Sequence, residues 1–402
     1  MFACVFYFFL GSLLGFLASE FADRWGCSQR YRSALPKKLF IVLMSGIGAA
    51  WLYWWEVKYQ MSLLPVEIPY HHALQPFILH IILFTFLLAA TLTDFYEMII
   101  PDTITVAGTL TALLIAILCL HPGTGLPTAY RIEAYWDGVD SGGCSYALTP
   151  LNVWSPNSPP ECNQLTQWTR SKIVAVFRTQ NLKWVPLSGI YSLIIMILLW
   201  WFWCFAMLDR VWYSRLPFRK AQAIFWRYLY RSPRTKYIIA AAVIVPLFFE
   251  PLVSDWKAET ALLSALTGMA AGMILIWAIR LTSRWVLGVE AMGFGDVTLM
   301  GMIGAFLGWQ PVLLIFFAAP FFGLIYGIIN LLLGKGRAVP YGPFLCLATV
   351  VVVIAWSPIW SATAEYFAFG IGVISAVMFV MLILFGVLLY GVHQIFQKIG
   401  KH

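Results

Sequence analysis

The chain has 402 residues, of which 61% are hydrophobic and only 11% are charged, and its net charge is +8. Soluble globular domains carry roughly 25% charged residues, so this composition excludes a soluble protein and indicates that lipid surrounds most of the chain. We therefore expect an all-α polytopic membrane protein, a bundle of about 8 to 11 transmembrane helices with membrane lipids as partners. The net charge of +8 has a simpler source in basic loops that face the cytoplasm, so we expect no nucleic-acid partner.

Long apolar runs predict the membrane spans in chain order, since a bilayer core of about 30 Å requires about 20 apolar residues per helix. The predicted spans are residues 2–18, 38–56, 75–93, 100–120, 184–208, 237–254, 260–282, 297–309, 311–334, 342–357 and 366–392. We interpret the first run as a retained span, because no small-residue cleavage site follows it. The run at 297–309 is short, and Gly301, Gly304 and Gly308 allow it to pack tightly or to be partly re-entrant.

Basic residues between the spans predict the orientation of the chain. With the N-terminus outside, one topology places all the basic segments on the cytoplasmic side, as the positive-inside rule requires. These segments are 24–38, 210–236, Arg284, 335–337 and 398–401. The agreement supports the predicted spans, because an error of one span near the middle would move several basic segments outside.

The spans and the longer polar segments divide the chain into regions. The regions are N-terminal transmembrane helices at 1–120, an extracytoplasmic polar insertion at 121–183, a transmembrane helix with a basic aromatic cytoplasmic segment at 184–236, and C-terminal transmembrane helices at 237–402. Cys144 and Cys162 both fall in the insertion, and a disulfide between them is expected if it faces an oxidising compartment. The seven cysteines form no CxxC pair and no zinc-type set with histidine, so we expect no metal and no cofactor.

Two aspartates stand at cytoplasmic span ends about two hundred residues apart in the chain, Asp94 and Asp296. A charged aspartate at bilayer depth costs roughly 2.5 to 3.5 kcal/mol, so each needs a reason. Two adjacent carboxyls share one proton, which allows the ionised member to activate water while the other polarises a peptide carbonyl. This chemistry is aspartyl proteolysis, and it predicts that Asp94 and Asp296 are the catalytic pair.

The residues around both aspartates fit such a site. Gly293 and Gly295 lack a Cβ, so their backbone can approach a substrate or a neighbouring helix closely. Pro101 removes a backbone donor and disfavours helix at Ile100, which predicts a turn after Asp94. Asp102 is interpreted as a cap of the next span rather than a catalytic group.

Two longer segments carry a family resemblance. Asp94 with Ile100-Pro101-Asp102, and Met292-Gly293-Phe294-Gly295-Asp296 with the following Gly304-Ala305-Phe306-Leu307-Gly308-Trp309, resemble the signature segments of the type IV prepilin peptidases, members of the GxGD aspartyl proteases. Pro340-Tyr341-Gly342-Pro343-Phe344 and Gly11-Ser12 resemble further motifs of the family.

The resemblance implies a multi-pass enzyme of the bacterial plasma membrane whose active site faces the cytoplasm. It implies cleavage of a short basic leader from type IV prepilins or type II secretion pseudopilins, just before their hydrophobic segment. Glu97 and Glu290 are candidates to contact such a substrate, or they are solvated loop residues. Many family members carry paired cysteines for zinc in the first cytoplasmic loop, where this chain has only Cys27, and N-methylation is linked to that region. Thr298 stands where the family usually has lysine.

Alternative functions remain open at this point. A transporter or channel would use intramembrane acids for coupling, but it predicts inverted repeats and acids at mid-span, and the sequence has neither. Another GxGD intramembrane protease, of the presenilin-like type, would have Tyr-Asp at the first site, whereas this chain has Thr93-Asp94. The histidines His71, His72 and His80 are interpreted as structural.

Overall fold

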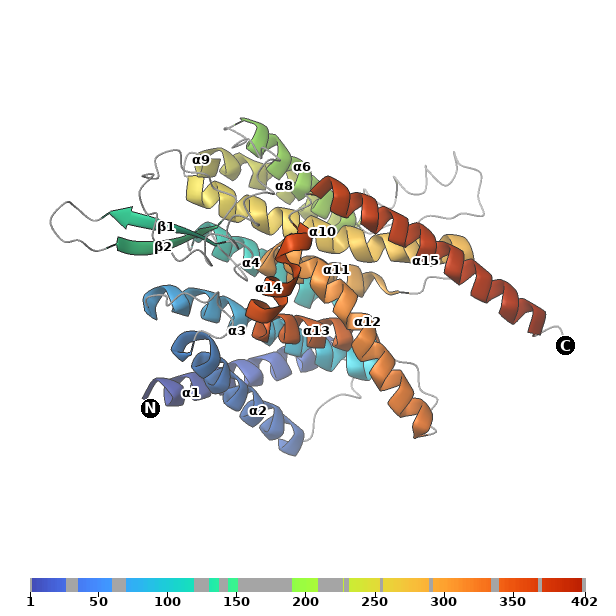
Figure 1. The fold of residues 1–402 in the computed structure, drawn as a ribbon, viewed down its shortest axis with the longest axis horizontal. Helices are drawn as coiled ribbons and strands as arrows, with labels where there is room; N and C mark the ends of the chain where they lie inside the picture. The colour runs from blue at the N-terminus through green and yellow to red at the C-terminus, as the bar shows by residue number, and fades with distance from the viewer. Residues whose placement is uncertain are drawn as a thin grey trace.

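The computed structural model describes residues 2–26, 35–59, 70–118, 130–136, 144–150, 190–208, 227, 231–253, 256–288, 292–333, 340–367 and 371–399. The helices are α1 (Phe2–Phe21), α2 (Leu35–Tyr53), α3 (Tyr70–Glu97), α4 (Asp102–Leu118), α6 (Ile190–Met207), α8 (Pro233–Ile244), α9 (Phe249–Val253), α10 (Trp256–Leu287), α11 (Phe294–Leu307), α12 (Trp309–Leu332), α13 (Gly342–Ile354), α14 (Trp356–Phe367) and α15 (Ile371–Ile399). Short turns of other helix types are η1 (Ala22–Gly26), η3 (Trp54–Lys58) and η5 (Val245–Phe248). Each predicted span coincides with one of these helices or with a series of them (Figure 1).

The helices confirm the predicted class, an all-α polytopic membrane bundle. Within the described residues, 5 helices are long and apolar enough to cross a bilayer, and shorter apolar helices accompany them. The long ones lie at Ala3–Arg24, Pro36–Lys58, Pro76–Glu97, Ala261–Val286 and Trp309–Asn330. Many large apolar side chains on α12 and α15 are exposed, as expected for surfaces that face lipid.

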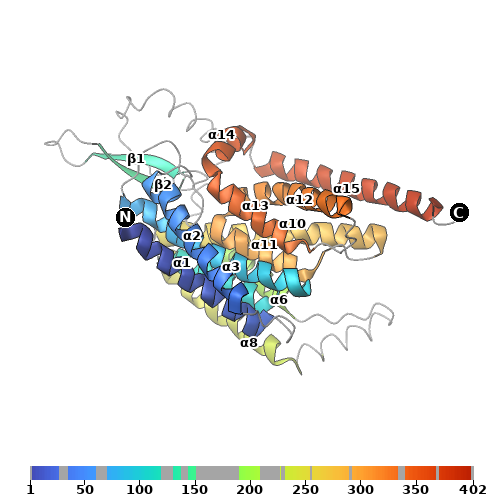
Figure 2. The ribbon, with the colours of Figure 1, turned by 90° about the horizontal axis from the view of Figure 1, so that it is seen from below.

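A small β-hairpin lies inside the polar insertion, where the sequence predicted no element. Strand β1 (Tyr130–Trp136) pairs antiparallel with β2 (Cys144–Pro150), with Trp136 opposite Cys144. The hairpin projects from the end of the bundle that holds the N-terminus, and the C-terminus lies at the opposite end (Figures 1 and 2). Cys162 lies outside the described residues, so its disulfide with Cys144 stays a prediction.

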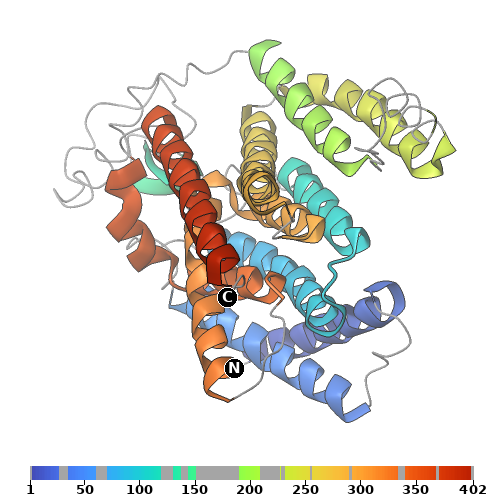
Figure 3. The same cartoon turned by 90° about the vertical axis from the view of Figure 1, so that its right-hand side faces the viewer.

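Helix α11 is the centre of the bundle. Every residue from Val297 to Leu307 is buried, which is typical of a helix that is apolar on all sides and enclosed by protein. Its 14 residues span about 21 Å, less than the roughly 30 Å of a bilayer core. Helices α3, α4, α10, α12 and α13 pack around it, and in the end-on view α1 with α2, and α6 with α8, lie at the periphery (Figure 3).

Two glycines bring α10 and α11 into backbone contact. A Cβ on Gly268 would clash with the Gly304 carbonyl oxygen, and a Cβ on Gly304 would clash with the Gly268 carbonyl oxygen. Small residues permit this approach between helices in a membrane, where packing rather than water drives association. The tight packing predicted at Gly304 is therefore confirmed, and it holds the helix that carries Asp296 against α10.

Candidate active site

Asp94 lies in the last turn of α3, just before a sharp change of chain direction. The Met98 amide donates to the Asp94 carbonyl at 2.9 Å, and Met98 adopts the left-handed region with φ +54°, which is uncommon for a residue other than glycine. Pro101 follows, and α4 begins at Asp102. The turn predicted after Asp94 is confirmed, and it returns the chain into the bundle beside the carboxylate.

The Asp94 carboxylate is buried and is held by the start of α13. The residue is 5% exposed, and its Oδ2 accepts a hydrogen bond from the Gly342 amide at 3.0 Å. Gly342 is the first residue of α13, so the carboxylate occupies a helix N-terminus, where unpaired amides and the helix dipole stabilise negative charge. A Cβ at this position would lie only 2.5 Å from Asp94 Oδ2, so the arrangement requires glycine.

Asp296 lies in the first turn of α11 and is also buried, with 8% of the residue exposed. The Gly293 backbone lies against its carboxylate, since a Cβ there would be 3.7 Å from Asp296 Oδ2. The Asp94 and Asp296 carboxylates are close enough to interact electrostatically. The structure thus brings together two carboxylates that are far apart in the sequence.

Ile100 fixes the spacing of the three segments that carry these groups. Its buried side chain lies between two glycines, because a Cβ on Gly295 would be 2.9 Å from Ile100 Cβ and a Cβ on Gly342 would be 2.8 Å from Ile100 Cδ1. The segment after Asp94, the start of α11 and the start of α13 therefore meet at one side chain. In the sequence this isoleucine is only one position of a motif, and its contacts give it a positioning role.

Tyr341 and Gly342 complete the site, although the sequence presents them only as part of a motif that resembles one of the family. Burial raises the pKa of the Tyr341 phenol, and the negative charge of Asp296 raises it further. Tyr341 therefore keeps its proton near neutral pH and can act as a hydrogen-bond donor beside the carboxylates. The Pro-aromatic-Gly-Pro-Phe pattern was the signal that could have identified both residues.

The arrangement can support acid–base chemistry on a peptide bond. Two buried carboxyls at this proximity share a proton more readily than they ionise together, and their titration belongs to the pair. One can take a proton from water while the other donates to a carbonyl oxygen. Within the described residues, no three His, Cys, Asp or Glu side chains come together in an arrangement that could hold a metal ion.

The other predicted site residues have different surroundings. Asp102 is exposed at the first position of α4, as expected for a residue at a helix start rather than in the pair. Glu97 is half-buried at the last position of α3, close in sequence to Asp94. Glu290 lies outside the described residues, so its role as a substrate contact stays a prediction.

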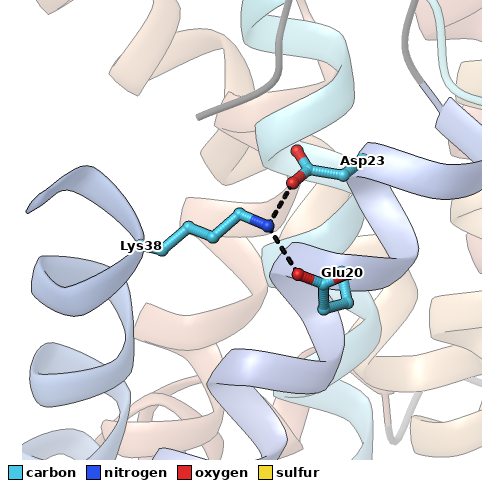
Figure 4. Close-up of polar contacts among 3 residues, drawn as sticks. All are labelled: Glu20, Asp23 and Lys38. Carbon is cyan, nitrogen blue, oxygen red and sulfur yellow. Dashed lines mark hydrogen bonds and ion pairs between the residues drawn. The ribbon is translucent and has the colours of Figure 1, made fainter. Parts of the chain in front are cut away.

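An ion-pair triad, which the sequence did not predict, connects the end of α1 with the start of α2 beside this site. Lys38 Nζ lies 2.5 Å from Glu20 Oε1 and 2.5 Å from Asp23 Oδ2 (Figure 4). The neighbouring Lys37 ammonium lies 6.0 Å from the ring centroid of Tyr96, two residues after Asp94. The triad therefore joins the end of α1 to the start of α2 next to the segment that follows the first carboxylate.

A second buried ionisable pair lies in the other half of α3. His80 Nδ1 is 2.8 Å from Glu56 Oε1, and both side chains are 2% exposed. The remaining Glu56 Oε2 and His80 Nε2 are buried without a hydrogen-bond partner among the described residues. The sequence pattern predicted a structural role for His80 but did not identify Glu56 as its partner.

The fold and the site define a polytopic α-helical membrane protein with two buried carboxylates at one end of its bundle. Residues 233–328 match the model of the type IV leader peptidase family. The matched residues include Asp296, whereas Asp94 lies outside them. Relatives named "Prepilin leader peptidase/N-methyltransferase" are 29% identical over 137 residues in Stutzerimonas stutzeri, 31% over 121 in Pseudomonas aeruginosa and 31% over 93 in Aeromonas salmonicida. Over these regions the chain is therefore similar to the type IV leader peptidase family and to relatives that carry the prepilin leader peptidase name.

The similarity covers only part of each protein. The aligned regions are 33%, 29% and 22% of this chain, and they span 46%, 42% and 32% of the respective relatives. The chain thus covers less than half the length of these curated relatives. No solved structure matches the chain.

Proposed function

We propose that this protein is a membrane-embedded aspartyl endopeptidase that removes the leader peptide from type IV prepilins or type II secretion pseudopilins. The observation that carries the proposal is the meeting of the buried Asp94 and Asp296 carboxylates at one end of the bundle. The family match and the names of the relatives support prepilins as the substrate, and the pseudopilins are part of the proposal.

In the proposed mechanism the pair holds one proton. The ionised carboxylate takes a proton from an attacking water, and the protonated partner donates to the scissile carbonyl oxygen. The Gly342 amide stabilises charge on Asp94, since it donates to Oδ2 and belongs to a helix N-terminus. Burial excludes bulk water from the pair and strengthens these interactions.

The site's location suits a substrate that is itself anchored in lipid. Both aspartates stand at helix ends on the side that the basic loops assign to the cytoplasm, where the junction between a basic leader and an apolar helix would lie. We propose the bacterial inner membrane as the location. The proposal does not extend to the N-methyltransferase activity in the relatives' names, because the first loop has a single cysteine, Cys27.

The test is cleavage of a purified prepilin with its leader by the full-length protein in detergent, compared with Asp94→Asn and Asp296→Asn. Each variant should lose at least about 1,000-fold in rate, because the carboxamide keeps the shape but cannot exchange the proton. Glu250→Gln, at an exposed carboxylate on α9, is the matched control and should cleave like the wild type. Substantial cleavage by either aspartate variant would remove that residue from the catalytic pair.

A further inference from the structure

A cation from α10 lies beside the start of α11. The Arg280 guanidinium is half-buried, and its Cζ lies 5.5 Å from the ring centroid of Phe294. An arginine at this distance from an aromatic face is held by a cation–π interaction. Phe294 is the first residue of α11 and stands two positions before Asp296, so the ring holds the positive charge at the start of the helix that carries this aspartate.

The charge of Arg280 acts on Asp296 electrostatically. Helix α11 itself supplies no such charge at the neighbouring buried position, where Thr298 is 4% exposed. The Thr298 hydroxyl donates to the Gly295 carbonyl at 3.0 Å and is directed to its own helix. The positive charge near Asp296 therefore comes from a different helix.

The remaining titratable groups around Asp296 do not carry a positive charge. They are Asp94 of α3, Tyr341 before α13 and Cys346 of α13, while Asp102 of α4 is exposed. Helix α12 contains no acidic or basic residue between Trp309 and Leu332. Among the described groups that interact with Asp296, Arg280 is thus the cation that can offset the charge of the pair.

We propose that Arg280 is a positioning residue of the catalytic pair, which supplies from α10 the positive charge that α11 lacks at Thr298 and so keeps the pair singly ionised. Ionisation of both carboxyls is disfavoured because their charges repel. A nearby cation lowers the cost of ionising one of them. The inference rests on the proposed function, because it assigns a role in the activity of that same pair.

The experiment is a pH–rate profile of prepilin cleavage by full-length wild type and Arg280→Gln. Loss of the cation disfavours ionisation of the pair, so the whole profile should move to higher pH by about one unit, and the rate on its acidic limb should fall about tenfold. Arg284→Gln, at an exposed arginine one turn farther along α10, is the matched control and should leave the profile in place. A lower rate with no movement of the profile would overturn the inference and indicate a purely structural residue.

Moving the positive charge from position 280 to position 298 sharpens the test, because recovery of the profile would show that the Arg280→Gln protein is folded. Thr298→Lys introduced into the Arg280→Gln protein should return the profile toward that of the wild type, because the cation then comes from α11. Phe294→Leu keeps the arginine but removes the ring, and it should give a smaller shift of the same sign. Failure of Thr298→Lys to move the profile back in a folded protein would also overturn the inference.

The two proposals can fail separately. Cleavage that survives Asp94→Asn or Asp296→Asn contradicts the proposed function itself. Cleavage that is lost in both aspartate variants, with an unchanged profile in Arg280→Gln, contradicts only the role of Arg280.

Discussion

Helix α3 carries a buried ionisable side chain in each of its halves, His80 and Asp94, separated by 14 positions or about 21 Å along the axis. His80 is paired with an acidic residue, and its Nδ1 lies 2.8 Å from Glu56 Oε1. Asp94 meets another carboxylate, Asp296, and a backbone amide. The first pair can neutralise itself and can serve as a structural contact. Two carboxylates cannot neutralise each other, so the pair of Asp94 and Asp296 is unfavourable unless it shares a proton. Such an arrangement is typical of a catalytic site.

His80→Ala is expected to show the largest difference between the two halves of α3, because it should affect stability and not activity. The change leaves the buried Glu56 carboxylate without its partner, and the free energy of unfolding should fall by about 3 kcal/mol or more. Denaturant unfolding in detergent measures the loss, and the protein that remains folded should cleave at close to the wild-type rate. The double change Glu56→Leu with His80→Leu should recover most of the stability, since an apolar pair removes the buried charge. A stable but inactive His80→Ala protein would contradict the comparison.

Gly342→Ala tests the proposed catalytic end, where the cleavage rate rather than the stability is expected to fall. Its new Cβ would lie 2.5 Å from Asp94 Oδ2, so the carboxylate must move, and a displacement of this size should lower the cleavage rate about 100-fold. Thermal unfolding should change much less than in His80→Ala. Gly327→Ala, in α12 with no atom within 4 Å of the added Cβ, is the control and should keep full activity. Equal rates for the two alanine variants would show that the glycine contact with Asp94 is unimportant.

The smallest effect is expected at the third aspartate of the region. Asp102 is exposed at the start of α4, and Asp102→Asn keeps an oxygen that can serve at a helix N-terminus. The cleavage rate of this variant should stay within about threefold of the wild type, because typical effects at such positions are small. A dead Asp102→Asn enzyme would require a different assignment of the catalytic pair.

The sequence by itself determined the membrane class and the positions of most helices, although α14 (Trp356–Phe367) falls largely between two predicted spans. Apolar runs must be enclosed by lipid or protein, and the length of each run is tied to the bilayer, so each predicted span coincides with a helix. It also singled out both aspartates as candidate site residues, because a carboxylate is costly at bilayer depth. The turn after Asp94 was predicted because Pro101 disfavours helix at the residue before it. The hairpin of β1 (Tyr130–Trp136) and β2 (Cys144–Pro150) was not predicted, although apolar residues such as Ile132 and Leu148 alternate with polar ones along its strands.

Only the tertiary structure decided which groups meet. The hydrogen bond from Gly342 to Asp94 joins residues 248 positions apart, and the wedge of Ile100 between two glycines depends on three helix ends at once. The Glu56–His80 pair and the approach of Arg280 to Phe294 likewise join separate helices. Periodicity and composition report the environment of a residue along its own helix, whereas partner identity depends on how helices pack, and packing is set by shape contacts such as Gly268 against Gly304.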